Sequence, residues 1–374
     1  MLSIDDFALR FDEEPGYLDF ARVGPLARTV VEEEQAQVEL LRKARFGSLD
    51  SLLAQDERVR TAVAAVTGFR PEQLVFQPNT STGLFQAMLG LDGGVLMSSA
   101  EFPSSPFAAV RASDALGALT PQWLDTDYGG VTAGAVKQQL TKETSAVAVS
   151  LVDFRTGHVA DLDGIRQVIG DRLLIVDAIQ GFTVVDAPYQ VADVVVSGGQ
   201  KWARAGWSTG FLALSDRAAD RIRPILSGFN ATDEGDMPLD SVPHPARGAR
   251  AFQVSNPSPI AEARLASALE EIAEVGVPAI AARVAEHAVR VIELADEFGI
   301  PVVSSRDDRE RAGIVVLEPA VDQFTVLVAS LHNHGVTVTS RGGTVRVSVH
   351  VTTTEETLGM LRAAFQSFAS ATTV

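Results

Sequence analysis

Short runs of apolar, mostly β-branched residues alternate with longer amphipathic stretches between about residues 72 and 215. Each run is bounded by Gly, Pro, Asp or Ser, which favour turns. Runs that are apolar throughout are typical of strands buried on both faces, as in a parallel sheet covered by helices. We therefore predict strands at QLVFQ (73–77), GVLMSS (94–99), SAVAVSLV (145–152), RLLIVD (172–177), DVVVS (193–197) and GFLALS (210–215).

The stretches between these runs carry apolar residues at helical spacing. Helices are predicted in TGLFQAMLG after Ser81, in PFAAVRASDALG around residues 106–117 and in DLDGIRQVIG at 161–170. A regular alternation of strand and helix predicts an α/β fold with a mostly parallel sheet.

Residues 221–256 interrupt this rhythm with Gly, Pro and acidic residues, and we expect a long functional loop there. The segments beyond it predict a smaller α+β domain. Its expected elements are helices at 258–275 and 277–299, strands in GIPVVSS, AGIVVLEP, GVTVTS and TVRVSVH, a helix near 321–333 and a last helix from about Thr353. The expected division is an N-terminal arm (1–15), a large domain (16–245) and a small C-terminal domain (246–374).

Composition and charge exclude several classes of partner and of functional site. The 374 residues are 46% hydrophobic and 21% charged, with a formal net charge of −17. Such a surface repels phosphate backbones and anionic lipids, so we expect neither nucleic acid nor membrane partners. The first residues contain no apolar run typical of a signal peptide and no segment approaches about 18 uninterrupted apolar residues, so we expect a cytoplasmic protein. The chain has no cysteine, which excludes disulfides, thiolate metal sites and a cysteine nucleophile.

Lys201 follows the predicted strand 193–197 through a Ser-Gly-Gly turn. The carboxyl end of a parallel sheet is where ligands bind, and a partly desolvated amine there can act as a nucleophile. An ordinary exposed lysine is the alternative interpretation.

Asp177 ends the apolar run RLLIV, so its carboxylate points out of the mouth of the sheet. It can cap the following turn, or it can pair with a protonated pyridine nitrogen such as that of a pyridoxal cofactor. In QPNTSTGLFQAM (77–88), Thr80, Ser81 and Thr82 open a helix after Asn79. They can form a phosphate site or serve as ordinary caps.

These three elements together resemble the class V aminotransferase family of fold-type I pyridoxal phosphate enzymes. The resemblance extends over nearly the whole chain and implies a large domain with a sheet of seven-stranded type and a smaller α+β domain. It rests on YLDFARVGPL (17–26), VFQPNTSTGL, AEFPSSPF (100–107), LVDFRTGHVADLDGI (151–165), VDAIQGFTVVD, SGGQKW, FQVSNPSPI (252–260) and VRVSVHVTTTEETL (345–358), in the family's order.

The resemblance implies a role for each matching residue. Lys201 would form the internal aldimine with pyridoxal 5′-phosphate, and Asp177 would pair with the pyridinium nitrogen. Gln180 would donate toward the ring 3-hydroxyl, and Phe102 would lie over the ring face. Phosphate would be held by Thr80, Ser81 and Gln200, while Asp153 and Asn256 complete the implied cofactor-binding set.

Arg346 matches the arginine that binds the substrate α-carboxylate, a role that suits a bidentate guanidinium. Arg155 and Arg341 are further candidates for binding substrate. Trp202 and Trp207 flank the lysine loop, where they either line the substrate pocket or simply pack. His332 and His334 invite a metal interpretation, but we expect them to end a helix, and we predict no metal site.

The reaction stays open among three classes. The main expectation is a class V aminotransferase acting at the α-carbon of an amino acid. A lyase, either a C–S lyase or kynureninase-like, is the alternative, since VDFRTGH and AFQVSNPSPI resemble kynureninase segments; without cysteine, a persulfide-forming desulfurase is excluded. A non-catalytic binding protein of this fold is the third. A dinucleotide enzyme is not expected, because no G-x-G-x-x-G turn follows the first strand.

The family resemblance also implies a homodimer in which each active site is completed by the other subunit. The loop 227–245 and Asn256 are where we expect these contributions. Asn230, Thr232 and Asn256 are the candidates for reaching the neighbouring subunit's phosphate site.

Overall fold

The computed structural model describes residues 2–126, 130–233 and 240–372. Seven strands form one large sheet in the order β1-β7-β6-β5-β4-β2-β3, and within it only β7 runs antiparallel to its neighbours. Its strands are β1 (Leu74–Phe76), β2 (Gly93–Ser98), β3 (Leu119–Leu124), β4 (Thr144–Ser150), β5 (Leu173–Asp177), β6 (Val194–Gly198) and β7 (Gly210–Leu214). The predicted mostly parallel α/β sheet is confirmed.

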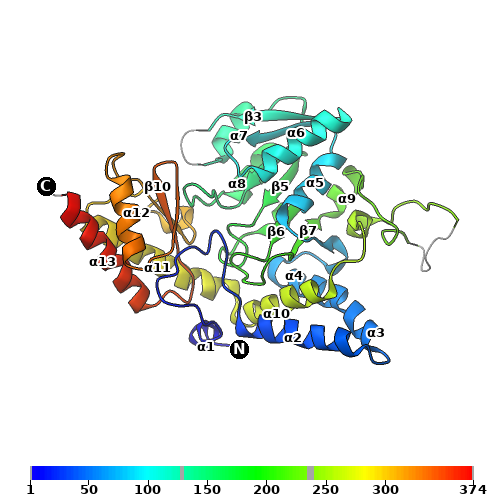
Figure 1. Cartoon of the computed structure of the whole chain (residues 1–374). Helices are drawn as coiled ribbons and strands as arrows, with labels where there is room; N and C mark the ends of the chain where they lie inside the picture. The colour runs from blue at the N-terminus through cyan, green and yellow to red at the C-terminus, as the bar shows by residue number, and fades with distance from the viewer. Residues whose placement is uncertain (1, 127–129, 234–239, 373–374) are drawn as a thin grey trace.

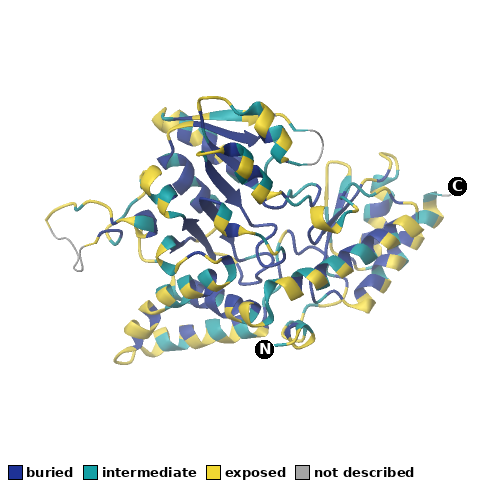
Figure 2. Cartoon of the chain, turned by 180° about the vertical axis from the view of Figure 1, so that it is seen from behind, coloured by how far each residue is buried: buried dark blue, intermediate teal, exposed yellow. Residues whose placement is uncertain are grey.

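Helices cover both faces of this sheet, and its central strands are buried (Figures 1 and 2). Two apolar clusters result, one on each face. The helices are α5 (Thr80–Gly90), α6 (Ser104–Leu116) and α9 (Asp216–Arg221) on one face, with α7 (Ala133–Gln139) and α8 (Leu162–Ile169) on the other. Because β4, β5 and β6 lack polar side chains at most positions, they are stable only when covered in this way.

The edge strand β3 is absent from the sequence prediction. Its LTPQWL segment contains Pro121 and several polar or half-buried positions, so it does not resemble the other runs. Proline has no N–H to donate and is tolerated in strands mainly at a sheet edge, and β3 lies at that edge next to β2.

The C-terminal region contains a second sheet of three antiparallel strands in the order β8-β10-β9. Its elements are α11 (Val277–Glu297), β8 (Ile314–Leu317), α12 (Phe324–Asn333), β9 (Thr339–Arg341), β10 (Thr344–Ser348) and α13 (Glu355–Thr372). The expected strand in GIPVVSS is wrong: Val302 forms a single bridge to Leu317, and the neighbouring Pro301 has no N–H for a continuous ladder.

Two N-terminal helices, α2 (Arg28–Lys43) and α4 (Gln55–Thr67), pack along α10 (Pro259–Val275), with the short α1 (Ile4–Ala8) and α3 (Ser48–Leu53) nearby (Figure 1). We call residues 9–27 the N-terminal segment. It runs between the two sheets: Tyr17 bridges Thr337 and Asp19 bridges Ser348, while the Gly24 N–H donates to the Gln200 carbonyl. No helix among the described residues combines the length and apolar character needed to cross a membrane.

Candidate active site

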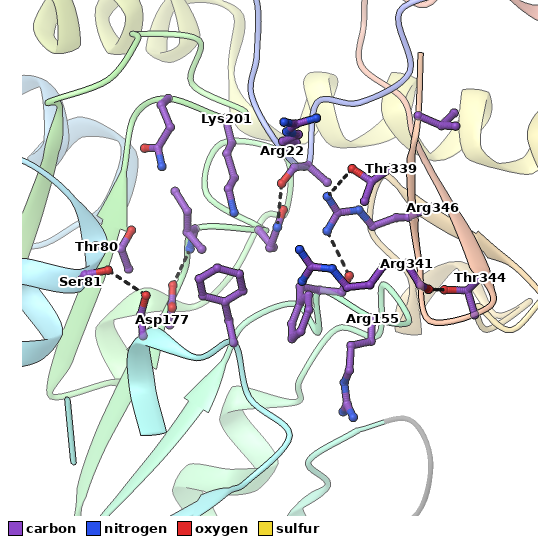
Figure 3. A pocket seen from close by; sticks show the side chains of 18 of the residues that line it. Arg22, Thr80, Ser81, Arg155, Asp177, Lys201, Thr339, Arg341, Thr344 and Arg346 are labelled. Carbon is purple, nitrogen blue, oxygen red and sulfur yellow. Dashed lines mark hydrogen bonds between the residues drawn. The ribbon is translucent and has the colours of Figure 1, made fainter. Parts of the chain in front are cut away.

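A cavity of about 890 Å³ lies where the carboxyl ends of β2, β4, β5 and β6 face the three-stranded sheet (Figure 3). Parallel strands bring their following loops together at this edge, which explains why residues far apart in sequence meet there. Ten of the twelve predicted site residues line it, namely Thr80, Ser81, Phe102, Arg155, Asp177, Gln180, Gln200, Lys201, Arg341 and Arg346. Asp153 and Asn256 do not.

Lys201 comes from the loop that follows β6 and is 8% exposed. The chain has four lysines, and the other three, Lys43, Lys137 and Lys142, are all exposed. Burial lowers the pKa of Lys201 to about 8, although the Asp177 carboxylate opposes this. About a tenth of its amine is therefore neutral, and hence nucleophilic, at pH 7, far more than for an ordinary lysine.

The N-terminal segment fixes the backbone of the lysine loop. A Cβ at Gly24 would lie 2.1 Å from the Lys201 carbonyl oxygen, so only glycine allows this contact. The buried Arg204, three residues after the lysine, donates to the Pro25 carbonyl, pairs with Glu13 at 2.5 Å and stacks on the ring of Phe11. These contacts with the N-terminal segment therefore hold the backbone of the lysine loop in one position.

Asp177 is the last residue of β5 and is buried. Its Oδ1 accepts a hydrogen bond of 3.0 Å from the Ile179 N–H, while no described residue is a partner for its buried Oδ2. Burial raises the pKa of Asp177 to about 6, and the Ile179 N–H and Lys201 act in the opposite direction. An unpartnered carboxylate oxygen at this depth is costly unless a ligand supplies a donor.

Helix α5 begins at the cavity. Asn79 caps it by accepting from the Thr82 N–H, so the free amides of the first turn point into the cavity beside two hydroxyls. Ser81 Oγ lies 2.7 Å from Ser104 Oγ, whereas the buried Thr80 Oγ1 has no described partner. The helix dipole and these groups together suit a phosphate.

Two phenylalanines lie beside the lysine. The rings of Phe102 and Phe154 meet edge to face at 5.3 Å, and Lys201 Nζ lies 5.4 Å from the centre of the Phe102 ring. Phe102 thereby offers an apolar face inside the cavity. Just before it, Glu101 accepts hydrogen bonds from the Ser150 N–H and hydroxyl, which ties this loop to the end of β4.

Gln180 links the cavity floor to the segments around it. Its Nε2 donates to the Ala21 carbonyl at 2.9 Å, and its Oε1 accepts from Trp202 Nε1 at 3.1 Å. One amide hydrogen remains for a ligand. Of the two tryptophans, Trp202 is buried and packs behind the cavity, and Trp207 is exposed; neither lines it.

Arg346 projects from β10 into the cavity and is held on three sides. It donates to the Phe154 carbonyl at 3.3 Å and to Thr339 Oγ1 at 3.4 Å, and its Nη2 lies 3.8 Å from Asp19 Oδ1. Thr339 in turn donates to Asp19 at 2.7 Å. The guanidinium is thus oriented before any ligand arrives.

The remaining predicted arginines differ from one another. Arg155 forms an ion pair of 2.7 Å with Asp153, whose Oδ1 also accepts from the Arg155 N–H, and Figure 3 shows Arg155 pointing away from Arg346. Arg341 precedes the hairpin turn between β9 and β10, and its guanidinium is directed into the cavity (Figure 3).

The asparagines predicted to serve the partner subunit lie outside this cavity. Asn230 donates to Asn256 at 3.0 Å, and Asn256 is exposed. Thr232 is buried and bridges Pro245. Within the predicted loop 227–245, residues 234–239 lie outside the described part of the chain. His332 and His334 end α12 as expected, and the described residues contain no cluster of metal-ligating side chains.

Among the residues not singled out from the sequence, Arg22, Phe154 and Thr339 line the cavity, and Asp19 contacts Thr339 and Arg346 beside it. Asp19 and Arg22 lie within YLDFARVGPL, so the signal was present as a motif but no chemistry was assigned to it. Thr339 and the Phe154 carbonyl orient Arg346. These contacts form only in the folded chain, and no spacing in the sequence indicates them.

The family model described as aminotransferase class-V matches residues 18–374. A kynureninase from Deinococcus radiodurans is 26% identical over 322 residues, which are 80% of this chain and 76% of that protein. A kynureninase from Xanthomonas oryzae pv. oryzae is 24% identical over 278 residues, which are 69% of this chain and 66% of that protein.

Solved structures share the fold. A cysteine desulfurase from Thermococcus onnurineus NA1 superposes with a TM-score of 0.84 at 21% identity, over 96% of this chain and 95% of that one. A cystine C-S lyase in complex with cysteine persulfide superposes with a TM-score of 0.84 at 18% identity, over 94% and 97% of the two chains. The predicted architecture of a large, mostly parallel sheet and a smaller antiparallel one is therefore confirmed.

Proposed function

The chain belongs to the class V aminotransferase family and is a pyridoxal phosphate-dependent enzyme acting on amino acids, and from this premise we propose that it is an aminotransferase that works through Lys201. The observation that carries the proposal is that the only buried lysine among the described residues lies on the same cavity as a buried carboxylate and a helix N-terminus.

The residues present fit this cofactor. Asp177 Oδ2 and Thr80 Oγ1 are buried without described partners, and a pyridinium N–H and a phosphate oxygen are groups that would satisfy them. Thr80, Ser81 and Gln200 would hold the phosphate, Phe102 the ring face, and Asp177 the ring nitrogen. The free hydrogen on Gln180 Nε2 is left for the ring hydroxyl.

Pyridoxal phosphate, when bound, supplies an aldehyde that condenses with amines and a ring that takes up electron density from the substrate α-carbon. Lys201 would hold this aldehyde and, once released by substrate, take the α-proton on Nζ as general base. Its lowered pKa suits both roles, because a neutral amine is required each time. Asp177, as a carboxylate, would keep the ring nitrogen protonated.

Arg346 would bind the substrate α-carboxylate. Since Phe154, Thr339 and Asp19 already orient its guanidinium, little ordering entropy is lost when the carboxylate docks. A substrate bound in this way would have its α-carbon between Arg346 and Lys201, within reach of the general base.

A lyase is the second candidate, and two observations favour it. The curated relatives described above are kynureninases, and the chain has no cysteine to carry a persulfide. An aryl substrate is disfavoured because the cavity is lined by several arginines and hydroxyl-bearing residues. Among the described residues that line it, the aromatic ones are Phe102 and Phe154.

Product stoichiometry separates these functions. The cofactor-loaded protein is incubated with single L-amino acids without an oxo acid, and products are quantified by NMR. An aminotransferase gives one equivalent of oxo acid per active site and then stops until an oxo acid acceptor is added. Repeated formation of pyruvate, alanine or ammonia without acceptor would establish a lyase instead. If no amino acid yields any product while the cofactor stays bound, the remaining interpretation is a non-catalytic binding protein of this fold.

We also propose a homodimer with shared active sites. The segment holding Asn230 and Asn256 exposes the large apolar side chains Leu226, Phe229 and Val254. Such a group of apolar side chains beside hydrogen-bonding residues is typical of a protein interface. Sedimentation at micromolar concentration tests this, and a fully active monomer would contradict it.

A further inference from the structure

The cavity has two arginines that the proposed chemistry at the α-carbon does not use. Resting on the proposed role of Arg346, we propose that the substrate carries a second acidic group on its side chain and that Arg22 and Arg341 bind this group. The substrate class is thus amino acids with a carboxylate, sulfinate or sulfonate at the distal end.

One wall of the cavity carries more positive than negative charge. Arg22, Arg341 and Arg346 all line the cavity, and the described carboxylate whose charge acts on Arg346 is that of Asp19. Asp19 is shared, since it lies 3.8 Å from Arg346 and 3.9 Å from Arg22. Two positive charges therefore remain without a counter-charge. An α-carboxylate neutralises one of them, and a second acidic group is needed for the other.

The guanidinium groups are close enough to influence one another. Burial lowers the pKa of Arg346, Asp19 opposes this, and Arg341 and Arg22 lower it further. Like charges gathered in this way are unfavourable in the free protein, so the arrangement calls for an anion.

Arg341 is held in place although its side chain is exposed. It precedes Gly342 and Gly343, which have φ of +58° and +86°, and it pairs with Thr344 across the hairpin. Positive φ at both central positions is what the tight two-residue hairpin turn requires, and glycine adopts it without strain. Thr344 Oγ1 also donates to the Arg341 carbonyl at 2.9 Å. The turn therefore fixes the backbone of Arg341 at the cavity, and Figure 3 shows its side chain extending into the cavity.

Among the arginines that line the cavity, only Arg341 lacks an ion pair with a described residue. Arg155, at the same cavity, is neutralised by Asp153 at 2.7 Å, and surface arginines such as Arg58 and Arg217 pair with carboxylates at 2.8 Å and 2.6 Å. In the described part of the chain Arg341 has no ion pair, in a protein whose net charge is −17. Acidic residues are abundant, so their scarcity on this wall leaves room for an acidic ligand.

The test uses the holoenzyme and ligands that cannot react because they lack an amino group. Calorimetric titration compares succinate and glutarate with their monoamides, succinamate and glutaramate. We expect the better dicarboxylate to bind about tenfold more tightly than its monoamide, as a charge-assisted hydrogen bond allows. Arg341→Gln and Arg22→Gln should each reduce this ratio, and the double variant should abolish it while monoamide affinity stays unchanged.

Two controls make the result specific. Arg111→Gln removes the same charge from an exposed pair with Asp114 on α6 and should leave the ratio unchanged. Arg346→Lys should weaken dicarboxylate and monoamide alike. Equal binding of dicarboxylate and monoamide by the wild type, or a ratio that survives in the double variant, overturns the inference.

Failure of the inference is distinguishable from failure of the proposed function. The stoichiometry assay is repeated with L-aspartate, L-glutamate and L-cysteate against L-asparagine and L-glutamine. Transfer of the amino group from neutral amino acids without any preference for acidic ones would refute the second acidic group but keep the aminotransferase. Dicarboxylate binding without any amino-acid conversion would refute the aminotransferase but keep the anion site.

Discussion

The two walls of the cavity differ in whether their polar groups already have partners in the protein. On the side of the large sheet, Asp177 Oδ2 and Thr80 Oγ1 are buried and lack described partners. On the side of the small sheet, Nη1 and Nη2 of Arg346 already contact the Phe154 carbonyl, Thr339 and Asp19, although its buried Nε has no described partner, and Arg341 is exposed.

This difference matches how long each ligand stays. Buried polar groups without partners are costly, and a protein tolerates them where a resident group satisfies them nearly all the time. A wall that binds and releases substrate in every turnover must be stable in both states. Its groups therefore need partners of their own or access to water. The wall on the large-sheet side, with Asp177, Thr80 and Lys201, suits a cofactor, and we call it the cofactor wall. The wall on the small-sheet side, with Arg346, Thr339 and the adjacent Asp19, suits a substrate, and we call it the substrate wall.

The largest effect is expected from the loss of the lysine on the cofactor wall. Lys201→Ala should lower kcat by on the order of 10⁴-fold, because both the covalent anchor and the general base are lost. Borohydride treatment followed by peptide mass spectrometry should attach the cofactor to the Lys201 peptide in the wild type and in Lys142→Ala, an exposed-lysine control. Attachment at Lys43, Lys137 or Lys142 in the wild type would contradict the assignment.

Removal of the cofactor should destabilise the protein more than removal of any substrate analogue. A ligand present at 1,000 times its Kd adds about 4 kcal/mol to the free energy of unfolding, whereas succinate at ten times its Kd adds about 1.4 kcal/mol. Urea unfolding of apoprotein, holoprotein and holoprotein with succinate measures both increments. An apoprotein as stable as the holoprotein would show that the unpartnered groups on the cofactor wall are not satisfied by the cofactor.

Asp19→Asn tests the substrate wall alone. The amide keeps the contact with Thr339 but removes the charge that holds Arg346, so we expect KM for the amino acid to rise about tenfold with little change in kcat or in cofactor retention. Asp12→Asn, in the same segment but exposed in an ion pair with Arg28, is the matched control. Loss of cofactor from Asp19→Asn would show that the two walls are not separable.

A pair of isosteric substitutions compares the walls directly. Thr80→Val removes a hydroxyl that has no described partner, so the apoprotein should be unchanged or stabilised by up to about 1 kcal/mol. Thr339→Val removes a hydroxyl with two partners and should destabilise the apoprotein by about 1 kcal/mol. Urea unfolding of the two apoproteins gives both values, and equal destabilisation would remove the distinction.

The smallest effect is on the rate at which apoprotein takes up cofactor. Only the neutral amine of Lys201 reacts with an aldehyde, and its pKa is lowered to about 8. The rate should therefore rise about fivefold between pH 7 and pH 8 and less than twofold above pH 8, as the protonated fraction falls. Stopped-flow absorbance follows this reaction. A rate that continued to rise tenfold per unit up to pH 10 would indicate an ordinary, solvated lysine.

Much of the large sheet was predictable, because buried parallel strands are marked by uninterrupted apolar runs. The runs at β5 and β6 lead directly to Asp177 and Lys201, so the cofactor wall could be predicted from position along the chain. The edge strand β3 was missed because its Pro121 and exposed positions carry no such pattern.

The substrate wall was harder to predict. Arg346 was found through a motif, but the contacts of Asp19 with Thr339 and Arg346 join positions more than 300 residues apart in the chain. No local period or spacing reports such a contact. Ligand binding by Asp153 and Arg155 stays a prediction; in the structure the two side chains form an ion pair with each other, a contact that the sequence does not indicate.

The crossing of the N-terminal segment between the two sheets also sets the order in which the enzyme becomes functional during translation. Asp19 and Arg22 leave the ribosome early, but Arg346 and the hairpin that carries Arg341 follow only after most of the chain has been made. At about 5–20 residues per second, the interval between Lys201 and Arg346 lasts several seconds or longer. The nascent chain therefore contains Lys201 well before it contains Arg341 and Arg346, the arginines proposed to bind the substrate.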